Sequence, residues 1–181
     1  SKITPEHRTC IECIGGIEQY LCQAATKLSV ELNMWTDLLF DGAPDKELAD
    51  QVRVAIDELF QADAALFSVE INEPTISNRL AHFLGKQFSE WDVDCEYNRD
   101  GHEIKTAYGR RVIPDIIVHH RQTPDNLLVV EVKKSTTRQP DQDDIQKLVA
   151  FRNSHLQYRY GLFLKFVVGG NVPDIQAAAW V

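Results

Sequence analysis

The sequence predicts an α/β (α+β) fold in which a small mixed sheet of four or more strands is flanked by helices. Apolar runs of strand length occupy three segments, Arg111–Val118, Asn126–Lys133 and Tyr160–Val168. The last run is apolar enough for a strand that is buried on both faces. Elsewhere apolar residues recur at helical spacing, so helices alternate with the strands. The expected order of the core is helix, three strands, helix, strand.

The first third of the chain is expected to be helical. From Thr4 to Leu39 and from Asp45 to Phe60, apolar residues recur every three or four positions, as on one face of an amphipathic helix. No pattern in this part indicates chemistry. We therefore interpret residues 1–67 as an N-terminal helical extension that packs on the core or forms a dimer contact, and residues 68–181 as the core domain.

The remaining core elements follow from local signals. A helix is expected from Glu73 to Phe88, since Pro74 suits its first turn. Trp91–Tyr97 alternates polar and apolar residues as a strand does. Another helix is expected to begin at Pro140-Asp141 and to turn Leu148 and Phe151 inward.

The net charge of −8 argues at first against a nucleic-acid partner, because phosphate binding is mostly cationic. The acid is concentrated early: residues 1–74 carry five Lys or Arg and 14 Asp or Glu, whereas residues 75–181 carry 14 and 13. The second part therefore has enough basic residues to contact phosphates.

Other features of the composition predict a cytoplasmic protein that does not enter a membrane. No apolar stretch has the length of a membrane span, and the first residues lack a secretory pattern. Four cysteines in 181 residues indicate reduced thiols more than a disulfide framework. Cys10-x-x-Cys13 has half of a zinc spacing, but no second pair follows, so we interpret these two residues as buried helix cysteines and keep zinc as the alternative.

Two short motifs carry the chemistry: Pro114-Asp115 and Glu131-Val132-Lys133. Side chains alternate along a strand, so Glu131 and Lys133 share one face of the sheet. Burying a carboxylate and a lysine among apolar residues is costly unless both are paired. With Asp115 from the neighbouring strand, they supply two anionic oxygens and a cation, a set that suits a hard divalent metal beside a phosphate. The alternative is a solvent-facing Glu–Lys pair at a strand end.

This order of elements, with Pro-Asp on one strand and Glu-x-Lys on the next, resembles the PD-(D/E)XK nuclease superfamily. The resemblance covers roughly Val69 to Val168. Three stretches, Val93–Arg99, Lys147–Arg152 and Tyr160–Phe163, are also similar to an uncharacterised subgroup of that superfamily. The resemblance implies a restriction-endonuclease-like core and hydrolysis of phosphodiester bonds that depends on Mg²⁺ or Mn²⁺.

The resemblance also implies the roles of individual residues. Asp115 and Glu131 would be catalytic carboxylates and metal ligands, and the backbone carbonyl of Val132 a third metal ligand. Lys133 would be the catalytic lysine, which orients the attacking water or stabilises charge on the phosphate. Glu73 is the expected further metal ligand, with Glu70 as the alternative.

Other residues near the motif are candidates with ordinary alternatives. Lys134, Lys147 and Tyr97 are candidates for substrate binding; the alternatives are solvated lysines and a half-buried tyrosine. Glu96, on the expected first strand, is a further candidate. His119 and His120 point to opposite faces of a strand, so we do not expect them to chelate one ion together.

Three hypotheses about function remain at this stage. The first is a metal-dependent nuclease, with an endonuclease on DNA favoured over RNA. The second is a catalytically inactive copy of the fold that binds nucleic acid or serves assembly. The third is an unrelated α/β protein with an accidental motif. Cutting both strands of a duplex with one site per chain requires two copies, so a homodimer is one expected arrangement.

Overall fold

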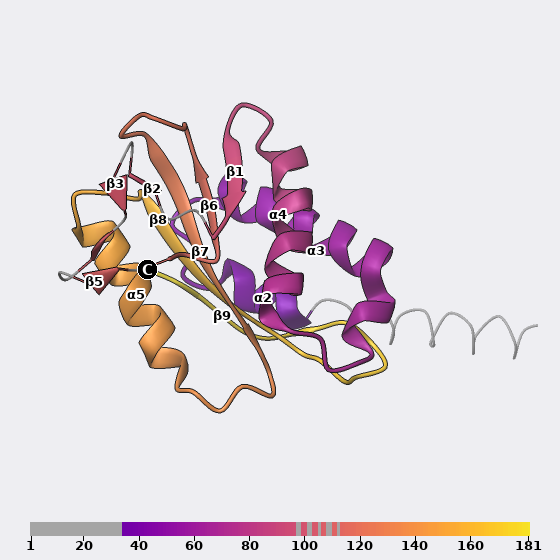
Figure 1. Ribbon diagram of the computed structural model, residues 1–181. Helices are drawn as coiled ribbons and strands as arrows, with labels where there is room; N and C mark the ends of the chain where they lie inside the picture. Colours follow the sequence, from indigo (N-terminus) through magenta and orange to yellow (C-terminus); the bar gives the residue numbers. More distant parts are fainter. Residues whose placement is uncertain (1–33, 97–98, 101–102, 105, 108–109, 112) are drawn as a thin grey trace, which may run out of the picture. The chain divides into compact units, whose positions relative to one another are not determined.

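The computed structural model describes residues 34–96, 99–100, 103–104, 106–107, 110–111 and 113–181 (Figure 1). One compact unit spans Trp35–Val181. Most of the helix predicted from Thr4 lies outside the described residues, as do Tyr97 and the cysteines Cys10, Cys13 and Cys22.

A five-stranded mixed sheet with flanking helices forms this unit. The strands lie in the order β1 (Asp92–Cys95), β6 (Ile116–His119), β7 (Asn126–Lys134), β8 (Tyr160–Phe166) and β9 (Ile175–Trp180). Only β7 and β8 run parallel; the other neighbours are antiparallel. Two short hairpins, β2 (Arg99–Asp100) with β3 (Glu103–Ile104) and β4 (Thr106–Ala107) with β5 (Arg110–Arg111), precede β6. The mixed α/β class predicted from the sequence is confirmed.

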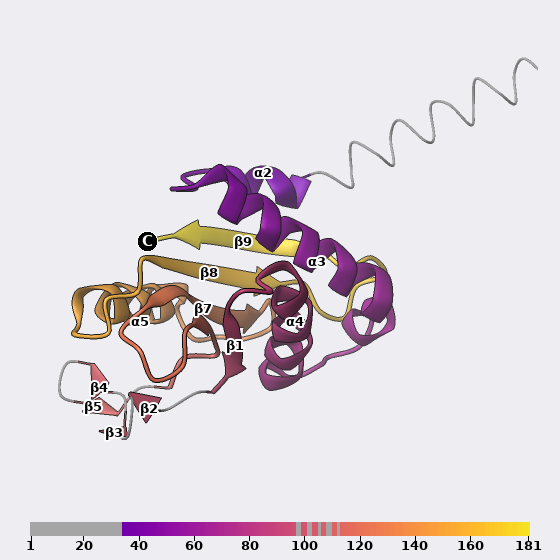
Figure 2. The ribbon, with the colours of Figure 1, turned by 90° about the horizontal axis from the view of Figure 1, so that it is seen from above.

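Helices cover the two faces of the sheet. In Figures 1 and 2, α3 (Lys46–Phe67) and α4 (Glu73–Gln87) lie on the opposite side of the sheet from α5 (Asp141–Asn153). The larger core lies between α2 (Met34–Phe40), α3, α4 and the sheet, and includes Val130 and Val132. The smaller core lies under α5 and includes Val129 and Phe163. Each face of β7 is therefore buried, as the near-continuous apolar run indicates.

Local chemistry explains where the helices begin. Asp45 caps α3, because its carboxylate accepts hydrogen bonds from the backbone N–H groups of residues 47 and 48. Asn72 caps α4 in the same way, through the N–H of Thr75. No helix in the described part of the chain combines the length and apolarity that a bilayer crossing requires.

Within the unit that spans Trp35–Val181, buried α3 residues such as Leu59 share the larger core with the sheet. The division expected between residues 67 and 68 stays a prediction. The structure differs from the sequence predictions at two places. The prediction of a single strand over Arg111–Val118 is wrong, because β6 begins only at Ile116. Pro114 has no N–H for the ladder and lies just before this strand. The alanine-rich strand β9 was not foreseen as an element.

Helix α5 lies unusually close to β8. A Cβ at Gly161 would lie only 3.2 Å from the Cβ of Leu148 and 2.7 Å from Cγ2 of Val181. The distance to Val181 is too short for a Cβ and the distance to Leu148 is tighter than most such contacts, so glycine permits this approach. The close packing fixes where the charged residues of α5 meet β7.

Candidate carboxylate and lysine site

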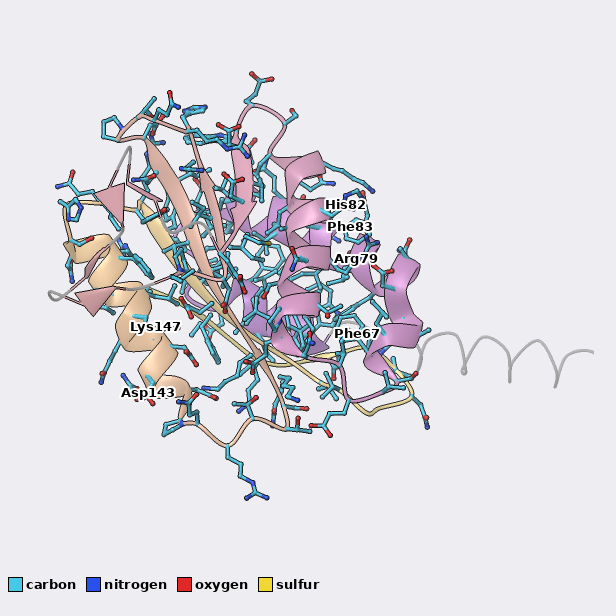
Figure 3. All side chains as sticks on the ribbon, viewed as in Figure 1. Phe67, Arg79, His82, Phe83, Asp143 and Lys147 are labelled. Carbon is cyan, nitrogen blue, oxygen red and sulfur yellow. The ribbon has the colours of Figure 1, made fainter. Side chains whose placement is uncertain are left out.

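Five charged residues gather where β6 begins and β7 approaches its end, under α5. We name Asp115, Glu131, Lys133, Asp144 and Lys147 the carboxylate–lysine cluster. Glu131 and Lys133 both contact side chains of α5, which confirms that they share one face of the sheet. Lys147 lies on α5 beside β7 (Figure 3).

Asp115 is fixed by the backbone of the neighbouring strand. It directly precedes β6, and its Oδ2 accepts a hydrogen bond of 2.7 Å from the N–H of Val132. The last β6–β7 pair before this point joins Ile116 and Val130. The carboxylate therefore occupies the position of a strand partner where the β6 ladder has ended, and both motifs meet through this bond.

Glu131 presents its two oxygens to different environments. The residue is only 1% exposed. Its Oε2 lies 2.5 Å from Nζ of Lys147. Its Oε1 is buried and has no hydrogen-bond partner among the described residues. A buried carboxylate oxygen without a partner is costly, and such a group calls for an explanation such as an ion.

The pKa values of both carboxyl groups are raised. Burial raises the pKa of Glu131 to about 8, and the nearby charge of Asp115 adds to this effect, although Lys147 opposes it. Burial also raises the pKa of Asp115, against the hydrogen bond from Val132. Burial is the largest single influence on Lys147 and tends to lower its pKa. The charge and hydrogen bond of Glu131, together with the charges of Asp115 and Asp144, outweigh burial, so the pKa is raised. Raised carboxyl pKa values with a specific charge partner are typical of functional sites.

Lys133 is enclosed by the first turn of α5. It is 3% exposed, and its Nζ donates to the carbonyl of Pro140 at 3.0 Å and to Oδ2 of Asp144 at 2.6 Å. The other oxygen of Asp144 lies 3.5 Å from Nζ of Lys147. Asp144 thus bridges the two lysines of the cluster.

Glu73 and Glu70 contact Lys134, the last residue of β7. Oε1 of Glu73 accepts hydrogen bonds from the N–H of Lys134 and the hydroxyl of Thr137. Its charge also contributes to the raised pKa of Asp115. Glu70 instead pairs with Nζ of Lys134 at 3.0 Å on the exposed side. The structure therefore brings Glu73 close enough to Asp115 to interact with it. Glu70 instead pairs with Lys134, which is a candidate substrate-binding residue.

The remaining candidates are less closely placed. Glu96 is exposed, and its backbone N–H donates to the carbonyl of Asp115. The side chain of Val132 packs in the larger core, on the face opposite to Glu131. His119 and His120 contact different acids, Asp94 and Asp125, as expected for residues that do not share an ion.

Sequence reasoning missed Asp141 and Asp144. Asp141 lies 3.6 Å from Nζ of Lys133 and holds Lys165, the residue opposite Lys133 in the register of β7 and β8. Acids in a first helical turn are ordinarily explained by the helix dipole, and Asp143 in that turn is indeed exposed (Figure 3). The i,i+3 spacing of Asp144 and Lys147 was the available signal.

The donors of the cluster fit a hard divalent cation in kind. No group of three or more His, Cys, Asp or Glu side chains converges as a metal site within the residues that the structure describes. Mg²⁺, however, is commonly bound by one or two carboxylates together with water and substrate phosphates. Asp115 and Oε1 of Glu131, which has no partner among the described residues, supply that minimal set.

Comparison of the chain with protein-family models, curated proteins and solved structures finds no match. The resemblance to PD-(D/E)XK nucleases therefore depends on the motif residues and their order, and it stays a prediction.

Proposed function

We propose that the chain is a divalent-metal-dependent nuclease with a restriction-endonuclease-like core, which hydrolyses phosphodiester bonds of DNA in preference to RNA. The observation that carries the proposal is the buried Oε1 of Glu131, which lacks a partner in the described structure while Asp115 meets the same strand. A cation at this oxygen would satisfy it. The choice of DNA follows the motif resemblance.

Asp115, Glu131 and the carbonyl of Val132 would hold Mg²⁺ or Mn²⁺, with Glu73 behind Asp115. When bound, such an ion lowers the pKa of a water molecule and polarises a phosphoryl group. The protein's own contribution is to orient the ligands. The N–H of Val132 fixes one oxygen of Asp115, and Lys147 fixes one oxygen of Glu131. Cationic lysines at the site would stabilise the charge that develops on the phosphate.

A cleavage assay tests this proposal. The purified chain is incubated with Mg²⁺ or Mn²⁺ and linear, circular, branched and single-stranded DNA, with RNA in parallel. We expect cleavage of at least one DNA substrate, and a loss of at least about 100-fold for Asp115→Asn. The amide oxygen that this substitution introduces can still accept the hydrogen bond from the N–H of Val132, so the variant should fold.

Asp94→Asn is the matched control, because Asp94 is a half-buried acid outside the cluster. It should cleave as the wild type does. A wild type that binds Mn²⁺ but cuts nothing would instead indicate a catalytically inactive nuclease-fold module. A wild type that neither binds Mn²⁺ nor cuts would contradict both functions.

A further inference from the structure

The two lysines of the carboxylate–lysine cluster differ sharply in their freedom to meet a substrate. Lys133, the lysine of the motif, is 3% exposed, whereas 38% of the Lys147 side chain is exposed. A side chain must be accessible from solvent to contact the phosphate of a bound substrate. The difference in exposure therefore decides which lysine can contact a phosphate without rearrangement.

Lys133 has little capacity left for a phosphate. Its ammonium donates to the Pro140 carbonyl and to Asp144, with Asp141 at 3.6 Å. Withdrawing this ammonium from its acceptors would cost the buried Lys133 its ion pairs, which is unfavourable. Its contacts all fix the start of α5 against β7. They suit a lysine that positions other groups.

Lys147 stands at the carboxylate expected to bind the metal. It occupies Oε2 of Glu131 and leaves Oε1 without a partner in the described residues. The Glu131 carboxylate thus contacts Lys147 through one oxygen and offers its other oxygen to a cation. A phosphate drawn to a cation at Oε1 would lie near the Lys147 ammonium, whose flexible stem allows it to follow a developing charge.

We propose that Lys147 is the residue that contacts the scissile phosphate, and that Lys133 is a positioning residue that acts on Lys147 through Asp144. This inference deepens the proposed function and depends on it. Asp144 carries the coupling, since its two oxygens contact the two ammonium groups at 2.6 and 3.5 Å. The lysine that contacts the scissile phosphate would then come from α5 and not from the Glu-x-Lys motif.

The test compares Lys147→Met, Lys147→Arg and Lys133→Met in single-turnover cleavage with Mg²⁺ and saturating DNA. Mn²⁺ affinity, measured by electron paramagnetic resonance, provides a readout independent of cleavage. We expect Lys147→Met to lose at least about 100-fold in rate. At a pH at which Glu131 is deprotonated, the variant should still bind Mn²⁺ at least as tightly as the wild type, because a competing cation has left Glu131. Lys147→Arg keeps the charge and should recover at least about tenfold of that loss. Lys133→Met should lose no more than about tenfold, with weakened thermal stability.

If Lys133→Met does not fold, Asp144→Asn takes its place, because it loosens Lys147 while retaining a hydrogen-bond acceptor. Its rate should fall by less than that of Lys147→Met. An active wild type whose Lys147→Met variant cleaves within about threefold of it would overturn the inference alone, as would a folded Lys133→Met or Asp144→Asn variant that loses more than Lys147→Met. A wild type that cuts no substrate would overturn the proposed function, and the inference with it.

Discussion

The two ends of the β6–β7 pair carry acids in opposite electrostatic settings. At one end lies the carboxylate–lysine cluster. At the other lies a group that we name the hairpin cluster, around the turn that joins the two strands: Asp92, Asp94, His119, His120, Arg121, Asp125 and Arg159. Both groups combine acids with cations and border the same pair of strands, so they can be compared for the effect of pairing.

In the hairpin cluster each acid has strong donors. Asp94 lies 2.9 Å from Nε2 of His119 and binds two nitrogens of Arg121. Burial is the largest single influence on Asp94 and tends to raise its pKa. The hydrogen bonds and charges of Arg121 and His119 together outweigh burial, so the pKa is lowered. In the carboxylate–lysine cluster burial prevails, and the pKa values of Asp115 and Glu131 are raised.

The difference separates a structural acid from a candidate ligand. An acid that is fully paired stabilises the fold as an anion. A buried acid with a raised pKa and a partnerless oxygen is destabilising until a cation arrives, and such an arrangement is retained where it serves a site. Charged residues at strand ends are thus informative only once their partners are known.

The largest effect on stability is expected at Glu131. Its folded-state pKa of about 8 lies above its ordinary value of 4.5. The protonated form is therefore favoured by folding, and this contribution is complete below pH 4.5 and lost as the pH rises to about 8. The free energy of unfolding of the metal-free protein should fall over that range by up to about 5 kcal/mol.

Chemical denaturation between about pH 5 and pH 9 measures this slope. Glu131→Gln has no proton to lose and should flatten most of it. An unchanged slope in that variant would show that Glu131 is not the titrating group.

Asp94→Asn should have a smaller effect with the opposite dependence on pH. Its lowered pKa means that the anion contributes stability above the ordinary pKa of 3.8, and that this contribution disappears as the pH falls through the lower folded-state value. We expect a loss of about 1 kcal/mol at neutral pH, reduced by the half-exposed position of Arg121. The gap from the wild type should close in acid. A gap that widens in acid would contradict the pairing described here.

The smallest effect is expected at Arg159. It pairs with Asp125 at 2.6 Å and lies over the ring of Trp91, but its side chain is 54% exposed. Exposed pairs contribute little, so Arg159→Ala should cost no more than about 1 kcal/mol. Thermal denaturation at low and high salt measures the difference, which salt should reduce. A larger, salt-independent loss would show that the hairpin cluster is more than a set of surface pairs.

Much of the frame could be predicted from the sequence. The long apolar run of β7 and strand parity are enough to place Glu131 and Lys133 on one face, and Pro-Asp followed by a strand brings Asp115 beside them. These inferences use local rules alone. The helix starts at residues 73 and 141 follow equally local proline signals.

The rest depends on tertiary packing. Lys147 contacts Glu131 only because α5 has a particular height and rotation on the sheet. The close approach of Leu148 on α5 to Gly161 on β8 sets that position. The same packing buries Lys133 against Asp144, although the motif singles it out as the reactive lysine. The strand β9 escapes notice because its Ala177-Ala178-Ala179 run lacks the branched residues that mark strands.

Titration with Mn²⁺ at about pH 8.5, followed by electron paramagnetic resonance, tests the metal site most directly, because most of Glu131 is then deprotonated. We expect the wild type and Asp94→Asn to bind Mn²⁺ with equal affinity, and Glu131→Gln to weaken binding by at least about tenfold. Absence of Mn²⁺ binding by the wild type, or equal binding by Glu131→Gln, would contradict the claim that Asp115 and Glu131 form a cation site.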